Sequence, residues 1–243
     1  MMPNAAEIDM RHHLAALPMF SGLSPLECDS VIPHCRLLSF TRGDMIFRKG
    51  DACEEFHALI SGRVKLYVVS ASGQEKVVEL VQQGHCFAEA AMFVESSYML
   101  NARALTNTLL LTIGKQAVLG EIARNSKFSM SLLSSISQRI QRLLHDVEGY
   151  TLNSGVRRLI DYLLNELVGN HTTVKGAVVI YLPASKATIA SRLSLTPEYF
   201  SRVLHALETA GLIEINKREI RILDTHRLAA YGGGSDGLSG ESE

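Results

Sequence analysis

Between residues 43 and 114, short strand-like runs alternate with single glycines, and this pattern constrains the fold more than any other feature of the chain. The glycines stand at positions 43, 50, 62, 73 and 84. The runs are rich in β-branched and aromatic residues: MIFRKG, FHALISG, RVKLYVVS, EKVVELVQ and, later, LLLTIG. Short strands with turn residues about every 8–12 positions are typical of a sandwich, roll or barrel. We therefore expect an all-β block that ends near Gly114, with SASGQEK as a hairpin turn.

Helical patterns flank this block on both sides. Residues 9–35 predict short helices, because Leu14, Leu17 and Phe20 share helical spacing and Ser24-Pro25 is a favourable helix start. Residues 115–149 predict helices again.

Apolar residues recur in the second of these helical segments at alternating intervals of three and four, the seam of a helix that pairs with another helix. The seam residues are Leu133, Ile136, Ile140, Leu143 and Val147. Polar residues are expected to cover the outside of the helix: Gln138, Arg139, Gln141, Arg142 and Asp146. Two interpretations stay open. The helix pairs with its own copy across a dimer axis, or it packs on its own β block.

The C-terminal part predicts a separate helical and β segment. YTLNSG, ending at Gly155, predicts a hinge, VRRLIDYLLNELVGN an amphipathic helix, AVVIYL a short strand pair and IEINKREIRIL a hairpin. The tail from Gly232 is rich in Gly, Ser and acids, a composition typical of disorder. The expected divisions are residues 1–114, 115–150, 151–228 and 229–243.

Two consecutive helices in this part predict a helix-turn-helix. A short helix from Ser185 to Leu193 is followed by a turn and by the stretch LTPEYFSRVLHALETAGLI. Thr196 is placed to cap the second helix, with Pro197 at its first position. The second helix should bury one apolar face, made of Phe200, Val203, Leu204 and Leu207. With the following hairpin as a wing, this motif inserts its second helix into the DNA major groove.

The other face of that helix carries the chemistry of base recognition. Arg202 can donate two hydrogen bonds to guanine, Glu198 can accept from the cytosine amine, and Ser201 can do either. Residues expected to hold phosphates are Ser185, Lys186, Thr196, Lys217 and Arg218. The alternative for Glu198 and Arg202 is a surface ion pair between positions i and i+4.

Charge and cysteine content narrow the classes of protein. The formal net charge is -1, but residues 151–227 hold 10 Lys and Arg against 7 Asp and Glu, a weak indication of a nucleic-acid partner. The four cysteines form no CxxC pair, so reduced thiols in a cytoplasmic protein are expected. The chain shows no signal-peptide pattern and no apolar run of membrane-spanning length, so we expect no membrane contact.

The whole order of elements resembles the CRP/FNR family of bacterial transcription regulators over about residues 10–228. The motifs that carry the resemblance are ISGRVKLY, GQEKVVELV, GHCFAEAAMF and TIASRLSLTPEYFSRVLHALETAGLI. It implies an α+β fold: an N-terminal β-roll of the cyclic-nucleotide-binding type, a long dimerisation helix and a C-terminal winged helix-turn-helix. It also implies a homodimer that binds a two-fold DNA site, contacts RNA polymerase and is expected to activate transcription.

The recognition helix resembles the FNR branch of the family. That branch reads DNA with an E-x-x-S-R pattern, present here as Glu198, Ser201 and Arg202. The implied half-site is TTGAT-like. CRP-type proteins have an additional Arg where this chain has Pro197.

The effector site departs from both well-known patterns of the family. Glu89 matches the ribose-binding Glu of cyclic-nucleotide binders, but Ala88 replaces the preceding Gly and SSYMLNA lacks the phosphate-binding Arg-Ser. Leu143 and Leu144 stand where adenine-contacting residues are expected. A cyclic phosphate would therefore lack a charge partner, so cAMP is not expected. The cysteines do not form the N-terminal cluster of Fe–S members, so no Fe–S cluster is expected.

FAEAAMF most resembles the regulators of dissimilatory nitrate respiration, which respond to nitric oxide with haem as the proposed sensor. Since His can ligate haem iron, the candidate axial ligands are His12, His13, His34, His57, His85 and His145. His85, at the expected rim of the cavity, is the first candidate. The effector cavity is expected to be lined by residues around this motif and the seam helix: Phe87, Glu89, Met92, Phe93, Tyr98, Met99, Leu100, Leu143 and Leu144.

Other functions remain as alternatives. They are a constitutive DNA binder with a vestigial pocket, a cAMP-responsive CRP-type regulator, and a β-roll regulatory module of an enzyme. The sequence shows no Walker A, GxSxG or HExxH motif, so enzyme activity is not expected.

Overall fold

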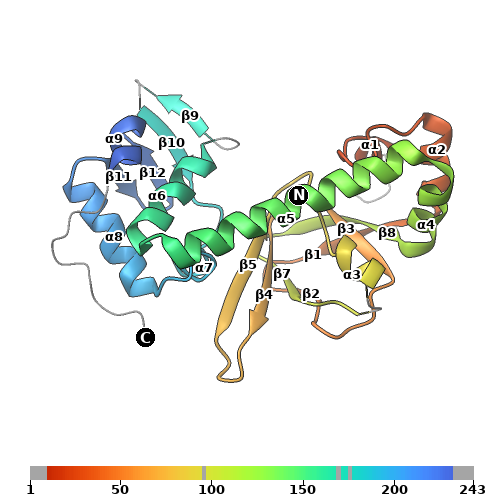
Figure 1. Ribbon diagram of the computed structural model, residues 1–243, viewed down its shortest axis with the longest axis horizontal. Helices are drawn as coiled ribbons and strands as arrows, with labels where there is room; N and C mark the ends of the chain where they lie inside the picture. The colour runs from red at the N-terminus through yellow and green to blue at the C-terminus, as the bar shows by residue number, and fades with distance from the viewer. Residues whose placement is uncertain (1–9, 95–96, 168–170, 175–176, 232–243) are drawn as a thin grey trace. The chain divides into compact units, whose positions relative to one another are not determined.

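The computed structural model describes residues 10–94, 97–167, 171–174 and 177–231. The chain divides into two compact units, Met1–Leu143 and Leu144–Glu243 (Figure 1). None of the helices in the described ranges is both long enough and apolar enough to cross a membrane.

Short helices open the first unit, as the sequence predicts. They are α1 (Met10–Ala15), α2 (Pro25–Val31) and the 3-10 turn η2 (Ile32–His34). Ser24 and Glu27 form a reciprocal capping box at the start of α2, in which each side chain accepts from the other's backbone N–H.

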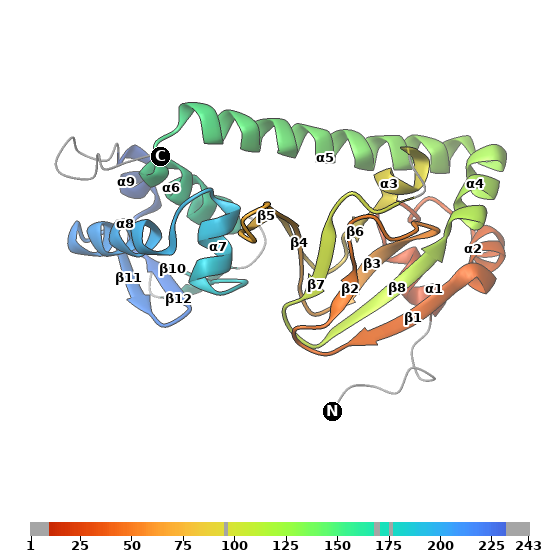
Figure 2. The same ribbon diagram turned by 90° about the horizontal axis from the view of Figure 1, so that it is seen from below.

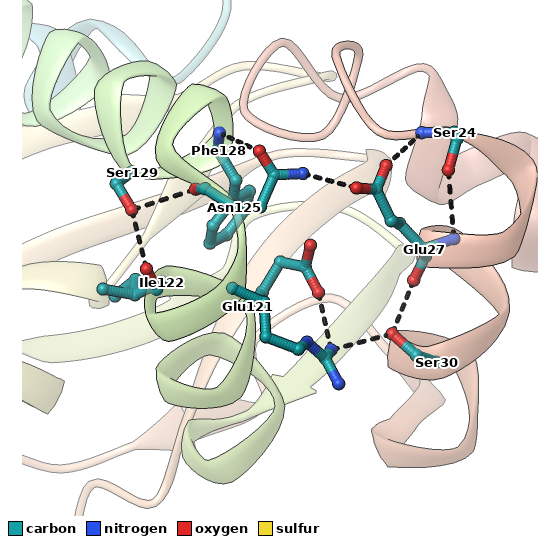
Figure 3. A network of polar contacts seen from close by, with 9 residues as sticks. Ser24, Glu27, Ser30, Glu121, Ile122, Asn125, Phe128 and Ser129 are labelled. Atoms are coloured by element: carbon teal, nitrogen blue, oxygen red, sulfur yellow. Dashed lines mark hydrogen bonds and ion pairs between the residues drawn. The ribbon is translucent and has the colours of Figure 1, made fainter.

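The capping residue Glu27 also ties α2 to the chain that follows the β block. Its carboxylate accepts from the Asn125 amide at 2.8 Å, and Arg124 donates to Ser30 at 3.1 Å (Figure 3). Arg124 ends α4 (Lys115–Arg124), and Asn125 stands at the junction with α5 (Ser126–Leu152). Hydrogen bonds therefore link α2 to the end of α4 and the start of α5.

The β block is a roll of two antiparallel four-stranded sheets, which confirms the expected fold class. One sheet has the order β1-β8-β3-β6 and the other β2-β7-β4-β5 (Figure 2). The first contains β1 (Cys35–Phe40), β8 (Thr108–Gly114), β3 (Glu55–Ser61) and β6 (Cys86–Phe87). The second contains β2 (Met45–Phe47), β7 (Asn101–Ala104), β4 (Val64–Val69) and β5 (Glu75–Val81). The apolar core of the unit includes side chains of both sheets.

Backbone geometry explains why one of the periodic glycines is needed. Gly62 has φ +95°, and a Cβ there would lie 2.5 Å from the Asn107 carbonyl oxygen and 2.7 Å from Thr108 Cα. An L side chain at this turn would meet backbone atoms as well as an unfavourable dihedral.

After the sheets, α3 (Glu89–Val94) lies at the end of β6, and α5 runs for 27 residues. The first turns of α5 bury Phe128 and Leu132 in the core of the roll. Ile136 is half-buried against the same core. The helix thus packs on its own β block through a face that only partly overlaps the predicted seam.

The second unit follows the expected winged helix-turn-helix order. It contains α6 (Gly155–Glu166), β9 (His171–Val174), β10 (Ala177–Tyr181), α7 (Lys186–Arg192) and α8 (Pro197–Thr209). It ends with β11 (Ile213–Asn216), β12 (Glu219–Ile222) and α9 (Thr225–Ala230). The strands form one antiparallel sheet in the order β11-β12-β10-β9. The predicted disordered tail from Gly232 lies outside the described residues.

Gly155, in the predicted hinge, is the buried first residue of α6, and the two units divide earlier, between Leu143 and Leu144. Helix α5 continues to Leu152, Ser154 caps α6 by accepting from the Arg157 N–H, and Gly155 is buried. A Cβ at Gly155 would lie 2.4 Å from Tyr199 Cε1 and 2.9 Å from Leu195 Cδ2. The glycine therefore permits close packing of α6 against the start of α8.

This contact predicts opposite effects for two glycine substitutions. Gly155→Ala should lower the free energy of unfolding by about 1–3 kcal/mol, because the added methyl group overpacks the Tyr199 contact. Gly149→Ala is the matched control, since it lies in α5 with open space around it and should raise that free energy by about 0.5–1 kcal/mol. Urea unfolding of both variants measures the difference. Equal effects would show that Gly155 is not packed as described.

Candidate functional site

The helix-turn-helix is built from two capped helices and a tight turn. Ser185 caps α7 by accepting from the Thr188 N–H, and Thr196 caps α8 by accepting from the Tyr199 N–H. Ser194 in the turn between them has φ +56°. The predicted apolar face of α8 is buried: Phe200, Val203, Leu204 and Leu207. The caps and this face fix the second helix, so its opposite side is free to meet a ligand.

That opposite side carries the three predicted base-reading residues. Glu198 and Arg202 are exposed, and Ser201 is half-buried. Among the described side chains Glu198 and Arg202 form no ion pair with each other, and the Arg202 guanidinium lies 5.4 Å from the centre of the Tyr199 ring. Ser201 Oγ donates to the Pro197 carbonyl at 2.9 Å, so its lone pairs remain available as acceptors. The Tyr199 ring therefore lies beside the Arg202 guanidinium, and Arg202 stays exposed.

The five predicted phosphate contacts divide into two kinds. Ser185 and Thr196 are helix caps whose oxygens already accept backbone N–H groups, and Arg218 donates to the Leu182 carbonyl at 3.1 Å. Lys186 stands at the first position of α7, and Lys217 is exposed with φ +56° in the β11–β12 turn. The two lysines are therefore the better-placed cations for phosphate.

A cluster that sequence reasoning missed joins the end of α5 to the helix-turn-helix. The Arg192 guanidinium of α7 binds Asp146 at 2.6 Å and the Tyr150 hydroxyl, and that hydroxyl donates to the Arg192 carbonyl at 2.6 Å. Burial raises the pKa of Tyr150 more than the neighbouring Arg192 lowers it. Arg158 of α6 donates to the Leu193 carbonyl at 2.9 Å. Residues 146–152 of α5 therefore belong to the same unit as α7 and α8.

The seam of α5 stays largely uncovered in the single chain. Leu133, Ile140, Leu143 and Val147 are 40–57% exposed, and only Ile136 is half-buried. Met130 and Leu144 extend the exposed apolar strip. An apolar strip of this kind on a surface marks an interaction site.

The predicted effector site contains a buried ion cluster. Glu89 is 2% exposed and accepts two hydrogen bonds from Arg139 Nη1, at 2.9 and 3.0 Å. The other terminal nitrogen of Arg139 binds Glu79. Burial alone would lower the pKa of Arg139, but Glu79 and Glu89 outweigh burial and raise it. Ala88, in the place of the family's glycine, keeps a positive φ of 68°.

This cluster corrects two expectations from the sequence. Arg139 was placed on the outside of the helix, yet its side chain is 16% exposed and faces the roll. The effector site was expected to lack a cation, and Arg139 supplies one. The helical pattern could not reveal this, because the inward face of Arg139 is set by carboxylates 50 and 60 residues away.

The predicted cavity-lining residues differ widely in exposure. Phe87, Met92 and Tyr98 are buried, Leu100 is half-buried, and Phe93, Met99, Leu143 and Leu144 are exposed. Tyr98 packs into the roll, with its ring stacked on Phe47 at 3.7 Å between centroids. His85 is exposed, and its Nδ1 lies 3.3 Å from the Gln83 carbonyl oxygen. The described part of the chain brings together no group of three His, Cys, Asp or Glu side chains suited to a metal.

These positions do not fit a haem. A haem needs a broad apolar cavity and an axial ligand aimed into it. His85 is on the surface, and Glu89 beside the expected cavity is held by a buried ion cluster. The arrangement of these residues therefore does not support the haem site suggested by the motif FAEAAMF.

One of the histidines considered as a haem ligand lies buried inside the roll. His57 of β3 is 2% exposed and packs against the rings of Phe47 and Phe87. Its Nε2 lies 3.1 Å from Tyr98 Oη. Burial, and secondarily the charge of Arg36, lowers the pKa of His57 to about 3. The imidazole is therefore neutral near pH 7.

The low pKa of His57 predicts acid sensitivity. Below pH 6.5 the unfolded chain protonates this histidine while the folded protein does not, so the free energy of unfolding falls as the pH is lowered from 6.5 toward 3. At pH 5 the loss should be about 2 kcal/mol from this residue alone. Urea unfolding at pH 7 and pH 5 should show a smaller pH effect in His57→Phe. His85→Asn, an exposed control, should keep the full effect.

Two known domain families match the chain in order. The cyclic nucleotide-binding domain matches residues 37–125, and the Crp-like helix-turn-helix domain matches residues 157–231. The Cyclic AMP receptor protein of Thermus thermophilus is 23% identical over 87% of this chain and 94% of that protein. FixK2 from Bradyrhizobium japonicum has the same fold, with a TM-score of 0.72 at 19% identity over 80% of this chain and 95% of that one. DNR from Pseudomonas aeruginosa is 30% identical over 94% of this chain and 98% of that one, with a TM-score of 0.49.

The matched segments coincide with the β-roll and with the unit that contains α7 and α8. The long α5 helix lies between them, as in the order expected from the sequence. The chain belongs to the CRP/FNR family of DNA-binding transcription regulators.

Proposed function

We propose that this protein is a homodimeric activator that reads TTGAT-like two-fold DNA sites through Glu198, Ser201 and Arg202. The observation that carries the proposal is the exposed first half of α8, where Glu198 and Arg202 are not paired with each other. An unpaired guanidinium can bind guanine O6 and N7, and an unpaired carboxylate can accept from the cytosine amine. Lys186 and Lys217 supply phosphate contacts that set the register of α8.

Dimerisation through the α5 seam supports the two-fold site. Half-sites about one helical turn apart need two recognition helices about 34 Å apart, which one chain does not supply. The exposed apolar strip of α5 is a self-complementary surface for a second copy. RNA polymerase is the proposed protein partner of the DNA-bound dimer.

We further propose that the effector is not a cyclic nucleotide. Arg139 already neutralises Glu89 and Glu79, so this cluster carries one excess negative charge. A cyclic phosphate would have to displace a carboxylate from Arg139 and would add a second excess negative charge in a semi-buried site. Titration of cAMP against DNA affinity tests this point. Activation by micromolar cAMP would contradict it and favour the cAMP-responsive alternative.

The expectation of haem and nitric oxide as effector rests on the FAEAAMF resemblance alone, and the exposed His85 does not support it. An absorbance spectrum of the protein after haem addition tests this expectation through the Soret band. A gas-sensitive band that persists in His85→Ala would place the iron ligand elsewhere. A constitutive DNA binder is the second candidate function, favoured by the ion cluster in which Arg139 already binds Glu89 of the expected effector site.

If Arg202 recognises a base, its removal should reduce sequence preference at one position of the DNA site. Arg202→Ala should weaken binding to a TTGAT-N4-ATCAA duplex by about 1–3 kcal/mol, and mainly relax the preference for one guanine. Arg202→Lys keeps the positive charge but removes the bidentate hydrogen-bond donor, so this variant should lose the same preference for guanine. Titrations against single-base variants of the duplex measure both.

Lys186→Ala is the matched phosphate-contact control. It should weaken binding to all duplexes about equally and reduce the salt slope by about one. An Arg202→Ala variant that behaves in this uniform way would show that Arg202 contacts phosphate and that α8 docks differently.

A further inference from the structure

Tyr199 stands among the proposed base-reading residues of α8, and the proposed function gives it no role. It follows Glu198 directly, precedes Arg202 by three residues and is half-buried. Its N–H donates to the Thr196 cap at 3.2 Å, which fixes its backbone at the start of the helix. A Cβ placed on Gly155 would lie 2.4 Å from Tyr199 Cε1 and 3.2 Å from Tyr199 Cζ. The phenol ring therefore lies directly against the backbone of Gly155.

The surface that supports this ring belongs to the start of α6. Gly155 is the buried first residue of that helix, and Ser154 caps the helix by accepting from the Arg157 N–H at 3.2 Å. Leu195 Cδ2 lies 2.9 Å from the same Cβ position, so Leu195 and the Tyr199 ring together fill the space beside Gly155. A ring packed this closely against a capped helix end has few alternative positions.

The same ring contacts a proposed base reader. The Arg202 guanidinium carbon lies over it, 5.4 Å from its centre, a distance at which the cation is attracted to the ring face. Such stacking uses the flat face of the guanidinium, whereas the bidentate contact to guanine uses N–H groups at its edge. Arg202 can therefore keep the contact with Tyr199 while it binds a base.

The contact with Tyr199 also competes with an ion pair on α8. Glu198 and Arg202 are spaced i, i+4 with the acid first, which is the favoured order for an ion pair on a helix. These two described side chains nevertheless form no such pair. An ion pair would occupy the carboxylate and the guanidinium that the proposed function assigns to cytosine and guanine. With Arg202 over Tyr199, both groups stay available to DNA.

We propose that Tyr199 is a positioning residue: supported by Gly155, it holds the Arg202 guanidinium ready for guanine and away from Glu198. Arginine loses rotamer freedom when it binds a base, and this loss occurs only at the base that it recognises. Ordering the side chain in advance therefore strengthens binding to guanine more than binding to the other bases. The inference rests on the base reading by Arg202 proposed above. It adds a specificity-determining role at an unassigned position of the E-x-x-S-R pattern.

Competition titrations of the full-length protein, with the TTGAT-N4-ATCAA duplex and its single-base variants, measure the preference for the guanine read by Arg202. Tyr199→Leu keeps an apolar side chain beside Gly155 but removes the aromatic face, so this preference should fall by about twofold to fivefold. Tyr199→Phe keeps the ring and should keep the preference. Tyr181→Leu, the same change at a tyrosine of β10 that is 56% exposed, is the matched control and should change nothing.

A second measurement follows the contact without DNA. In protein labelled with ¹⁵N-arginine, Arg202→Ala removes one Nε–Hε resonance and so assigns it. The ring current of Tyr199 shifts that resonance, so Tyr199→Leu should move it and Tyr199→Phe should leave it near its place.

Three results would overturn the role of Tyr199: a full guanine preference in Tyr199→Leu, an equal loss in Tyr199→Phe, or an Arg202 resonance that Tyr199→Leu does not move. Failure of the base reading itself looks different, because Arg202→Ala would then lose preference at no single position. That outcome would overturn both proposals. A position-specific loss in Arg202→Ala, with none in Tyr199→Leu, would overturn the role of Tyr199 alone.

Discussion

Replacing Arg139 with methionine is expected to lower the free energy of unfolding by about 3–5 kcal/mol. The methionine preserves much of the buried stem but leaves Glu89, 2% exposed, without its two hydrogen bonds. Glu79 loses its partner at the same time. A buried carboxylate without a partner destabilises the fold far more than the intact ion pair stabilises it. The expected loss in free energy of unfolding therefore reports mainly the uncompensated charge.

A second variant distinguishes this cause from lost packing. In Arg139→Met with Glu89→Leu, the buried charge is gone, so the double variant should be more stable than Arg139→Met alone. Arg142→Met, an exposed position on the same helix, is the control and should change stability by less than about 0.5 kcal/mol. Urea unfolding followed by circular dichroism measures all of them. If Arg139→Met and Arg142→Met were equally stable, Arg139 would not be the partner of Glu89 in solution.

The elements that the sequence predicts well are those whose signal is local. Glycine-bounded runs of β-branched residues predicted β2, β3, β4, β5 and β8, and cap residues placed α2, α7 and α8. β6 and β7 were missed because they have two and four residues, and the alternating apolar positions of NARA are only alanines. β1 was missed because CRLLSF follows the helical segment without a glycine between them.

The parts of the site that could not be predicted depend on contacts between distant segments. Whether Arg139 faces solvent or the roll depends on Glu79 and Glu89, which periodicity within α5 cannot show. Gly155 resembles a hinge in sequence, and its packing role appears only when Tyr199 lies against it. His57 is one of nine histidines, and only the surrounding Phe47, Phe87 and Tyr98 rings make it distinctive.

The recognition helix lies between these cases. Its caps, its buried face and its exposed polar face could all be predicted from the sequence, because one short segment carries them. The contact of the Arg202 guanidinium with the Tyr199 ring could not be predicted, although both residues stand in the same segment. Local patterns thus located the helix, while the state of each side chain on it required the structure.

The second large effect is expected at the α5 seam, where Ile140→Glu should convert the proposed dimer into monomers. Ile140 is 52% exposed in the single chain and lies at the centre of the apolar strip, so a two-fold axis along α5 would bring both copies of the residue together. Glutamate there would place two like charges in an apolar interface without partners. Sedimentation should then show a monomer at micromolar concentration. The fold itself should persist, because Ile140 does not belong to the hydrophobic core of the roll.

Loss of the dimer should also weaken DNA binding far more than any single base contact does. In a dimer the second recognition helix binds its half-site at a high effective concentration, which is worth about 10²–10⁴-fold in affinity. Ile140→Glu should therefore bind the two-fold duplex at least about 100-fold more weakly, and bind a single half-site as the unaltered chain does. Gln138→Glu adds the same charge at an exposed position outside the seam and should remain dimeric with full affinity. An Ile140→Glu protein that sediments as a dimer would place the interface elsewhere on the molecule.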